Sequence, residues 1–419
     1  GDTADDQGIY LDNTDILSTS TSASAGTITL VGQSVGTSGA GVRFLNGSLI
    51  ESVDGDIIVS GNADAHPGVF FLTGTGGTVR STGTGANAAN ITINGASATA
   101  FSGIQIDPGL ITAVDGNISL TGVTDSGNGL LFDEGSITTT GTGPDAGSIT
   151  LSGTSNSGIG ANFQQAFQVT SVDGDISLDG TGSTGIRMQS TSNLQSTGAG
   201  VDAANISLTG AGSGTDILLQ NSGSRLSANA GSITLNANTL QLDAGVQGSG
   251  ELIIQPRNFF GSVGIGDGST GTLNLTAAEV ANIQDGFSVI RIGNGRAGQT
   301  DVNTITFSDP LVIDSDETFI NGQLTGIDNA TITLRDSIEL ATTHLNADIV
   351  TNGNAVLVDD HLIVDGARTI DTTNGGSVAA GADVIFNLAV EAFAGEGTGG
   401  GLTVDGGTTG IVTFNSAVG

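Results

Sequence analysis

The sequence contains no cysteine, no lysine and no tryptophan, and only one of its 419 residues is a tyrosine. The absence of cysteine excludes a disulfide-stapled fold and a cysteine-ligated metal site. Positive charge comes from nine arginines alone, against 42 aspartates and glutamates, which leaves a net charge of −33. A surface this acidic repels nucleic acids and anionic lipids, and it attracts divalent cations.

Long apolar runs are also missing. No stretch of 18 consecutive apolar residues occurs, so we expect no insertion into a membrane. The chain opens without the charged and apolar segments of a signal peptide, and we expect any such segment to lie outside it. Because the strand pattern reaches both ends, we interpret the sequence as a window on a longer polypeptide.

Glycine is abundant, at 69 residues, and much of it marks a repeat between residues 8 and 235. Each unit opens with an apolar strand, usually after a glycine, and the spacings between openings are 33, 27, 35, 26, 29, 27 and 31 residues. Longer and shorter units alternate, so the true repeat is a pair. The openings are Gly8-Ile9-Tyr10-Leu11, Gly41-Val42-Arg43-Phe44, Gly68-Val69-Phe70-Phe71, Gly103-Ile104-Gln105-Ile106, Gly129-Leu130-Leu131-Phe132, Gly158-Ile159-Gly160-Ala161, Gly185-Ile186-Arg187-Met188 and Asp216-Ile217-Leu218-Leu219.

A second strand closes each unit with strict alternation, as in Ile28-Thr29-Leu30. Successive side chains of a strand point to opposite faces, so the apolar positions share one face and the hydroxyls take the other. Stacked units would then form two buried columns, which we predict as the core ladder. Its members are Ile28, Leu30, Ile57, Val59, Ile91, Ile93, Ile118, Leu120, Ile149, Leu151, Ile176, Leu178, Ile206, Leu208, Ile233 and Leu235.

A third short apolar stretch, such as Leu49-Ile50 or Leu110-Ile111, lies between the opening and closing strands. Three strands in a unit of this length, repeated without helices, are typical of a solenoid. We therefore predict an all-β fold, a parallel β-helix (β-solenoid) with about three strands per rung. No unit folds alone in such a fold, because neighbouring units cover its apolar face.

The rest of the chain is less regular. We predict a regular paired-rung array over residues 1–256, an irregular glycine-rich insertion over 257–300, and a second array over 301–419 that is truncated within a longer chain. The insertion holds one helical signature near residues 276–284. There Thr276, with Glu279 three residues later, forms a capping box.

Acidic corners recur in the shorter units, as in Val53-Asp54-Gly55-Asp56. Asp-Gly is a strong turn dipeptide, which explains these residues without any ligand. Carboxylates at every second rung would also suit calcium, which prefers oxygen ligands. Both interpretations stay open, and we expect no other cofactor. The predicted calcium ligands are Asp54, Asp56, Asp115, Asp173 and Asp175.

Catalysis is disfavoured by the same recurrence. Asp54 and Asp56 resemble a glycosidase carboxylate pair, but the pair is repeated at Asp173 and Asp175, and a site repeated along the array is architecture. Polysaccharide-cleaving β-helices also need aromatic rings and cations, which are scarce here. We expect no enzyme.

Several segments resemble a known family. They include Leu252-Ile253-Ile254-Gln255-Pro256, the stretch from Leu273 to Glu279, and the Gly-Ile-x-Leu and Gly-x-Ile-Thr-Leu units of the array. Together they are similar to the large secreted repeat exoproteins of the filamentous haemagglutinin type. The resemblance implies a right-handed β-helix, two-partner secretion, and an extracellular or outer cell-surface role in adhesion or fibre formation.

These observations favour a secreted structural β-solenoid segment that forms an extracellular or cell-surface fibre. Its partners would be other copies or neighbouring repeats of the same chain, with no nucleic acid and no membrane insertion. The alternative is a cell-surface adhesin that binds a glycan or matrix ligand through loops of the longer units, such as residues 83–90.

Overall fold

The computed structural model describes residues 7–72, 76–221, 223–337, 341–393 and 401–419. It confirms a nearly all-β parallel β-helix with regularly stacked strands. The chain divides into two compact units. Residues 1–233 and 241–249 form the first unit, and residues 234–240 and 250–419 form the second. The chain passes between them three times, within β22 (Ile233–Asn236), within β23 (Leu240–Leu242) and between Ser249 and Gly250.

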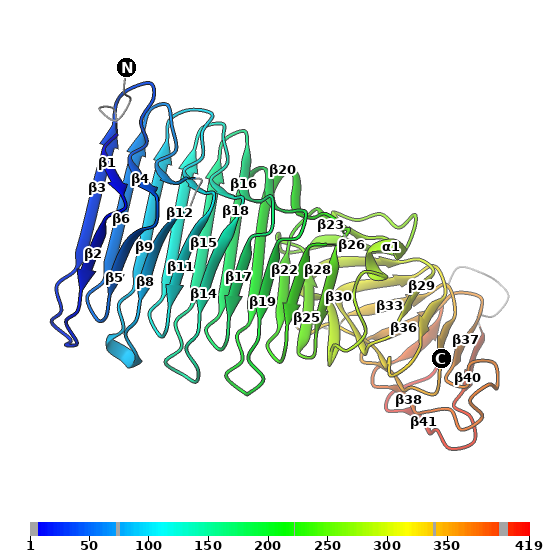
Figure 1. The fold of residues 1–419 in the computed structure, drawn as a ribbon. Coiled ribbons are helices and arrows are strands. Elements are labelled where there is room, and N and C mark those ends of the chain that lie inside the picture. Colours follow the sequence, from blue (N-terminus) through cyan, green and yellow to red (C-terminus); the bar gives the residue numbers. More distant parts are fainter. Residues whose placement is uncertain (1–6, 73–75, 222, 338–340, 394–400) are drawn as a thin grey trace. The chain divides into compact units, whose positions relative to one another are not determined.

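A rung of the first unit has three strands, which we call opening, middle and closing. In the second rung they are β4 (Val42–Leu45), β5 (Ser48–Ser52) and β6 (Ile57–Ala63). Asn46 and Gly47, both at positive φ, make the turn between the first two. Each strand pairs in parallel with the same strand of the neighbouring rung, at a spacing of about 4.8 Å. The strands therefore stand side by side from blue to green in Figure 1.

The strands of this unit fall into these three sets. The opening strands are β1 (Ile9–Asp12), β4, β7 (Val69–Phe71), β10 (Ile104–Ile106), β13 (Leu130–Phe132) and β16 (Ile159–Phe163). The middle strands are β2 (Asp15–Ser18), β5, β8 (Gly77–Ser81), β11 (Gly109–Ala113), β14 (Gly135–Thr139), β17 (Gln168–Ser171), β19 (Asn193–Ser196), β21 (Arg225–Ala228) and β24 (Gly245–Gly248). The closing strands are β3 (Ile28–Ser34), β6, β9 (Ile91–Ser97), β12 (Ile118–Thr124) and β15 (Ile149–Ser155); in β18 (Ile176–Met188) and β20 (Ile206–Leu219) a closing and an opening strand are continuous.

The predicted core ladder lies inside the solenoid. In the first unit the closing strands pair without a register shift from Ile28 through Ile57 and onward to Ile206, and Leu30 begins the second column. From Ile57 to Leu235 all fourteen side chains are at most 1% exposed, whereas Ile28 and Leu30 in the first rung are half-buried. Burying each such side chain contributes roughly 1.5–3 kcal/mol.

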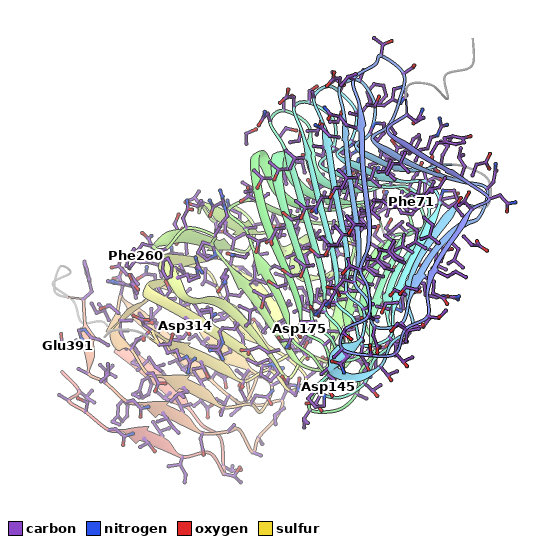
Figure 2. The ribbon with its side chains drawn as sticks, turned by 90° about the vertical axis from the view of Figure 1, so that its left-hand side faces the viewer. Phe71, Asp145, Asp175, Phe260, Asp314 and Glu391 are labelled. Atoms are coloured by element: carbon purple, nitrogen blue, oxygen red, sulfur yellow. The ribbon has the colours of Figure 1, made fainter. Side chains whose placement is uncertain are left out.

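Aromatic rings form a further buried column along the opening strands, which Ile106 of β10 interrupts. Phe44 and Phe71 are register partners whose rings stack with centroids 4.3 Å apart. Farther along, Phe132 lies 4.7 Å from Phe163 and 4.6 Å from Phe167, and all three are fully buried. Offset or stacked contacts of this kind add to the free energy of burial. Figure 2 labels Phe71 among these strands.

The predicted opening at Gly158-Ile159-Gly160-Ala161 was wrong by two residues. The register pairs Leu130 with Ala161 and Phe132 with Phe163, so the rung opens at Gly160. Two glycines fit the motif, and packing selects the one that places Phe163 in the aromatic column. With this correction the openings from Gly129 onward are spaced 31, 25 and 31 residues apart, which makes the alternation of longer and shorter rungs more regular.

Glycine is required at one inward position of every closing strand. A Cβ built on Gly122 would stand 2.0 Å from the carbonyl oxygen of Gly129, where the next opening strand begins. The same close approach recurs in each rung, so the two strands cross at a column of glycines. Its members are Gly32, Gly61, Gly95, Gly122, Gly153, Gly180 and Gly210.

The second unit is again built from three sets of strands. One set is β25 (Glu251–Gln255), the first part of β28 (Val289–Val302) and of β30 (Leu311–Ile320), β32 (Ile332–Arg335), β35 (Val356–Val358), β38 (Val384–Phe386) and β41 (Val412–Phe414). A second is β26 (Gly261–Ile265), the last part of β28 and of β30, β33 (Thr342–Leu345), β36 (His361–Val364) and β39 (Val390–Ala392), with β27 (Leu273–Leu275) beside β26. The third is β29 (Ile305–Phe307), β31 (Leu324–Gly326), β34 (Ile349–Thr351), β37 (Ala367–Asp371) and β40 (Gly401–Asp405).

The expected short helix is α1 (Ala277–Val280). Its capping box is complete, because the Thr276 side chain accepts from the Glu279 backbone and the Glu279 carboxylate accepts from the Thr276 backbone. Residues 289–300, which the sequence predicts as part of the irregular insertion, belong instead to strand β28, whose pairing with β30 shifts register between Ile292 and Ala297. No helix of the described residues is long and apolar enough to cross a membrane.

Candidate functional site

The acidic corners of the first unit divide into two structural roles. Asp115 and Asp173 are half-buried, and each accepts a hydrogen bond from the backbone of the preceding long loop, from Gly85 N at 2.6 Å and from Gly143 N at 2.7 Å. Asp54 stands at the equivalent corner beside Gly83. These carboxylates hold long loops in place, as turn chemistry predicts.

Asp56 and Asp175 are exposed and begin ladders of hydrogen bonds along the corner. Asp56 Oδ1 accepts from both the backbone and the side-chain nitrogen of Asn90, at 2.9 and 3.1 Å. Asn90 Oδ1 accepts in the same way from Asn117, and Asn117 Oδ1 from Ser148. Asp175 repeats this arrangement with Asn205 and Ser232. A carboxylate only accepts, so it can stand at the start of a ladder but not within one.

These geometries bring the five predicted calcium ligands to one corner of the rungs. Asp145 and Asp175 lie where the corner loops gather (Figure 2). Within the part of the chain that the structure describes, no three Asp, Glu, His or Cys side chains form a group that could hold a metal ion. The calcium site therefore stays a prediction, and the observed contacts are those of turns and ladders.

An acidic residue of the second unit is neutralised by arginine. Asp314 is fully buried, and its carboxylate lies 3.5 Å from Arg291 and 3.4 Å from Arg335. Ser337 donates to the other oxygen from its backbone and its hydroxyl, both at 2.9 Å. These ion pairs and hydrogen bonds satisfy the buried carboxylate, so Asp314 has a structural role.

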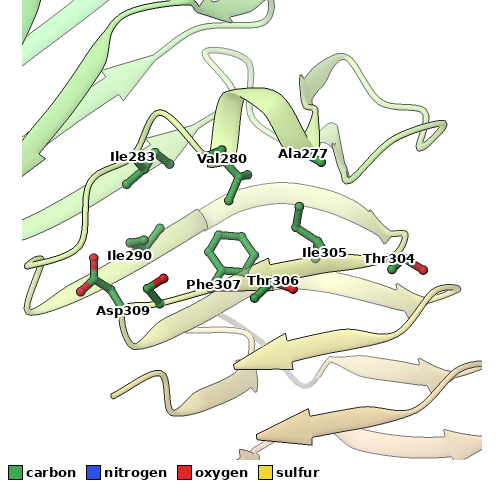
Figure 3. Close-up of a pocket in the computed structure, with 11 residues that line it drawn as sticks. Ala277, Val280, Ile283, Ile290, Thr304, Ile305, Thr306, Phe307 and Asp309 are labelled. Atoms are coloured by element: carbon green, nitrogen blue, oxygen red, sulfur yellow. The ribbon is translucent and has the colours of Figure 1, made fainter. Parts of the chain in front are cut away.

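A cavity of about 410 Å³ lies between α1 and β29 (Figure 3). Apolar side chains line most of it, among them Val280, Ile305 and Phe307, and Asp309 stands at one end. Burial raises the pKa of Asp309, and the neighbouring Asp285 raises it further, although Gly286 donates a hydrogen bond at 2.9 Å. This hydrogen bond ties Asp309 to the backbone at Gly286.

One cluster was missed by the sequence analysis. Tyr10, Arg43 and Phe70 are register partners on the outward face of three successive opening strands. His66 and Phe101 come from neighbouring loops, with their rings stacked at 4.8 Å. The signal was present in the sequence, since the first three residues occupy the same position of their units. It was overlooked because we treated the openings as core strands.

No protein-family model matches this chain, and comparisons with curated proteins and with solved structures give no significant match.

Proposed function

We propose that this chain is a structural β-solenoid segment of an extracellular or cell-surface fibre and has no enzymatic activity. The observation that carries the proposal is the unbroken register of the closing strands across the first unit. Each rung presents its neighbour with the same backbone donors and acceptors and the same apolar columns. Such an array is extended by adding rungs, without any new kind of contact.

The rung of β41 has an apolar surface that a further rung would cover, whether it came from the same polypeptide or from another copy. The register places Val412 and Phe414 of β41 beside Val384 and Phe386 of β38. The latter pair is at most 1% exposed, whereas Val412 is 38% and Phe414 is 42% exposed. A further rung would bury this surface and pair the free edge of the strand, and open edges are templates for such pairing. The likeness of the repeat motifs to secreted exoproteins supports the extracellular location.

Electron microscopy of the purified chain, with calcium and after chelation, tests the proposal. We expect filaments that lengthen with protein concentration. Phe414→Lys should abolish them, because it places a charge on the apolar edge. Thr413→Lys, on the opposite face of the same strand, is the matched control and should leave them intact.

Two other results are informative. Single rods at every concentration, confirmed by sedimentation, would overturn the fibre proposal. Filaments that dissolve on chelation would support calcium at Asp54, Asp56, Asp115, Asp173 and Asp175, and filaments that persist would assign assembly to backbone pairing and the ladders.

A further inference from the structure

Cationic and aromatic side chains gather at one place on the first unit, although the chain as a whole is acidic and poor in aromatic residues. On the outward face of β1, β4 and β7, Tyr10, Arg43 and Phe70 follow one another in register. The Arg43 guanidinium lies 5.7 Å from the centre of the Phe70 ring. His66 and Phe101 stack beside them. We call these five residues the Arg43 cluster.

Arg43 lacks the acidic partner that Arg80, Arg291 and Arg335 have. Arg80 pairs with Glu51, and Arg291 with Glu251 and Asp314. Arg43 forms no ion pair with any residue that the structure describes, and its buried Nε has no hydrogen-bond partner. A partly desolvated guanidinium without a partner is costly, and a ligand carboxylate would supply the two oxygens that it binds best.

The surroundings of Arg43 add ring surface but no second positive charge. Burial lowers the pKa of His66, and the charge of Arg43 lowers it further, so His66 is neutral at neutral pH and leaves Arg43 as the cation of the cluster. Tyr10 and Phe101 are each 43% exposed. Their ring faces carry partial negative charge and attract the polarised C–H groups of a sugar ring.

We propose that the Arg43 cluster binds a carbohydrate that carries a single carboxylate, with the sugar ring on the aromatic faces and the carboxylate on Arg43. A single charge matters, because the net charge of −33 repels a polyanion whose other charges extend beyond the reach of Arg43. The Arg43 cluster is a different site from the loops of the longer units, which the adhesin hypothesis assigns to glycan binding. Binding at the cluster does not depend on fibre formation.

The chain offers its own reporter for a test. Tyr10 is the only tyrosine and there is no tryptophan, so intrinsic tyrosine fluorescence reports on the cluster alone. We suggest titrating the full chain with a disaccharide of glucuronic acid and glucose, and with cellobiose as its neutral counterpart. The acidic disaccharide should change the Tyr10 signal and bind at least about tenfold more tightly than cellobiose.

The variant Arg43→Gln should reduce the affinity for the acidic disaccharide to that for cellobiose and leave cellobiose binding unchanged. Arg187→Gln is the matched control. Arg187 occupies the same outward position of a later rung but donates a hydrogen bond to Asn162 at 3.1 Å. The Arg187→Gln variant should bind both sugars as the unmodified chain does.

The inference is overturned if neither sugar changes the Tyr10 signal up to about 10 mM, if both bind equally, or if the two arginine variants behave alike. Tighter binding of a heparin fragment or of tetraglutamate than of the acidic disaccharide would also overturn it, and would assign the cluster to a polyanion or to an acidic peptide.

Discussion

The two units build the same kind of rung with different interiors. In the first unit, apolar and aromatic columns fill the core and a glycine column lets two strands cross at backbone contact. Its described residues include one fully buried carboxylate, Asp216. The second unit buries Asp309, Asp314 and Asp360 and has no comparable glycine column among its described residues. The comparison teaches that one fold can depend on close backbone packing at glycines in one region and on satisfied buried carboxylates in another.

The largest effect should come from filling the glycine column. In Gly122→Ala the new Cβ would meet the Gly129 carbonyl oxygen at 2.0 Å, so the backbone has to move. Overpacking that shifts backbone should lower the free energy of unfolding by about 3 kcal/mol or more. Urea unfolding followed by circular dichroism measures this change.

Gly200→Ala serves as the control for that measurement, because nothing lies within 4 Å of its Cβ position. Equal stability of the two variants would show that the strand crossing tolerates a side chain. The glycine column would then not distinguish the first unit from the second.

The second unit should respond to pH through Asp360. This carboxyl is buried and accepts from the Thr343 hydroxyl at 2.7 Å, and burial raises its pKa to about 6. The folded state therefore binds the proton more tightly than the unfolded state does. The contribution of Asp360 to the free energy of unfolding is greatest below about pH 4 and falls as the pH rises to about 6. Above that pH it is constant, and the total loss is up to about 3 kcal/mol.

Asp360→Asn should raise the free energy of unfolding at pH 7.5 and flatten its change between pH 4 and pH 7. The gain will be less than the full loss, because the amide has one oxygen for the donors that the carboxylate now accepts. Urea unfolding across this pH range measures it. Asp328 is exposed, so Asp328→Asn should leave the dependence of unfolding free energy on pH unchanged. If Asp360→Asn also left this dependence unchanged, Asp360 would not make the second unit sensitive to pH.

The smallest effect should come from the corner ladder of the first unit. Asn117→Ala removes a donor to Asn90 and the acceptor for Ser148. Because the ladder is exposed, the expected loss is about 1 kcal/mol. Asn117→Ser is the control, since serine already fills this position at Ser148 and Ser232. Hydrogen exchange of the corner amides should become faster in the alanine variant and much less so in the serine variant. Equal protection in both variants would mean that the ladder does not contribute to stability.

Much of the fold was readable from the sequence because its determinants are local and repeated. Alternation in Ile28-Thr29-Leu30 and its successors predicts one buried face, and Thr276 with Glu279 predicts the start of α1. The candidate calcium ligands were placed at a common corner by the same repetition. Their hydrogen bonds could not be predicted, since each joins residues about 30 positions apart, as Asp115 and Gly85 are.

By itself the sequence determined the parallel strands, the three-strand rungs and the apolar columns, because side-chain alternation and glycine spacing recur in every unit. Only the tertiary structure decided the register at Gly160, which depends on how Phe163 packs against Phe132. It also decided which acidic residues are buried and that Arg43 has aromatic neighbours and no carboxylate. Burial and contact between rungs depend on where the chain returns after a full turn, and local pattern does not specify that position.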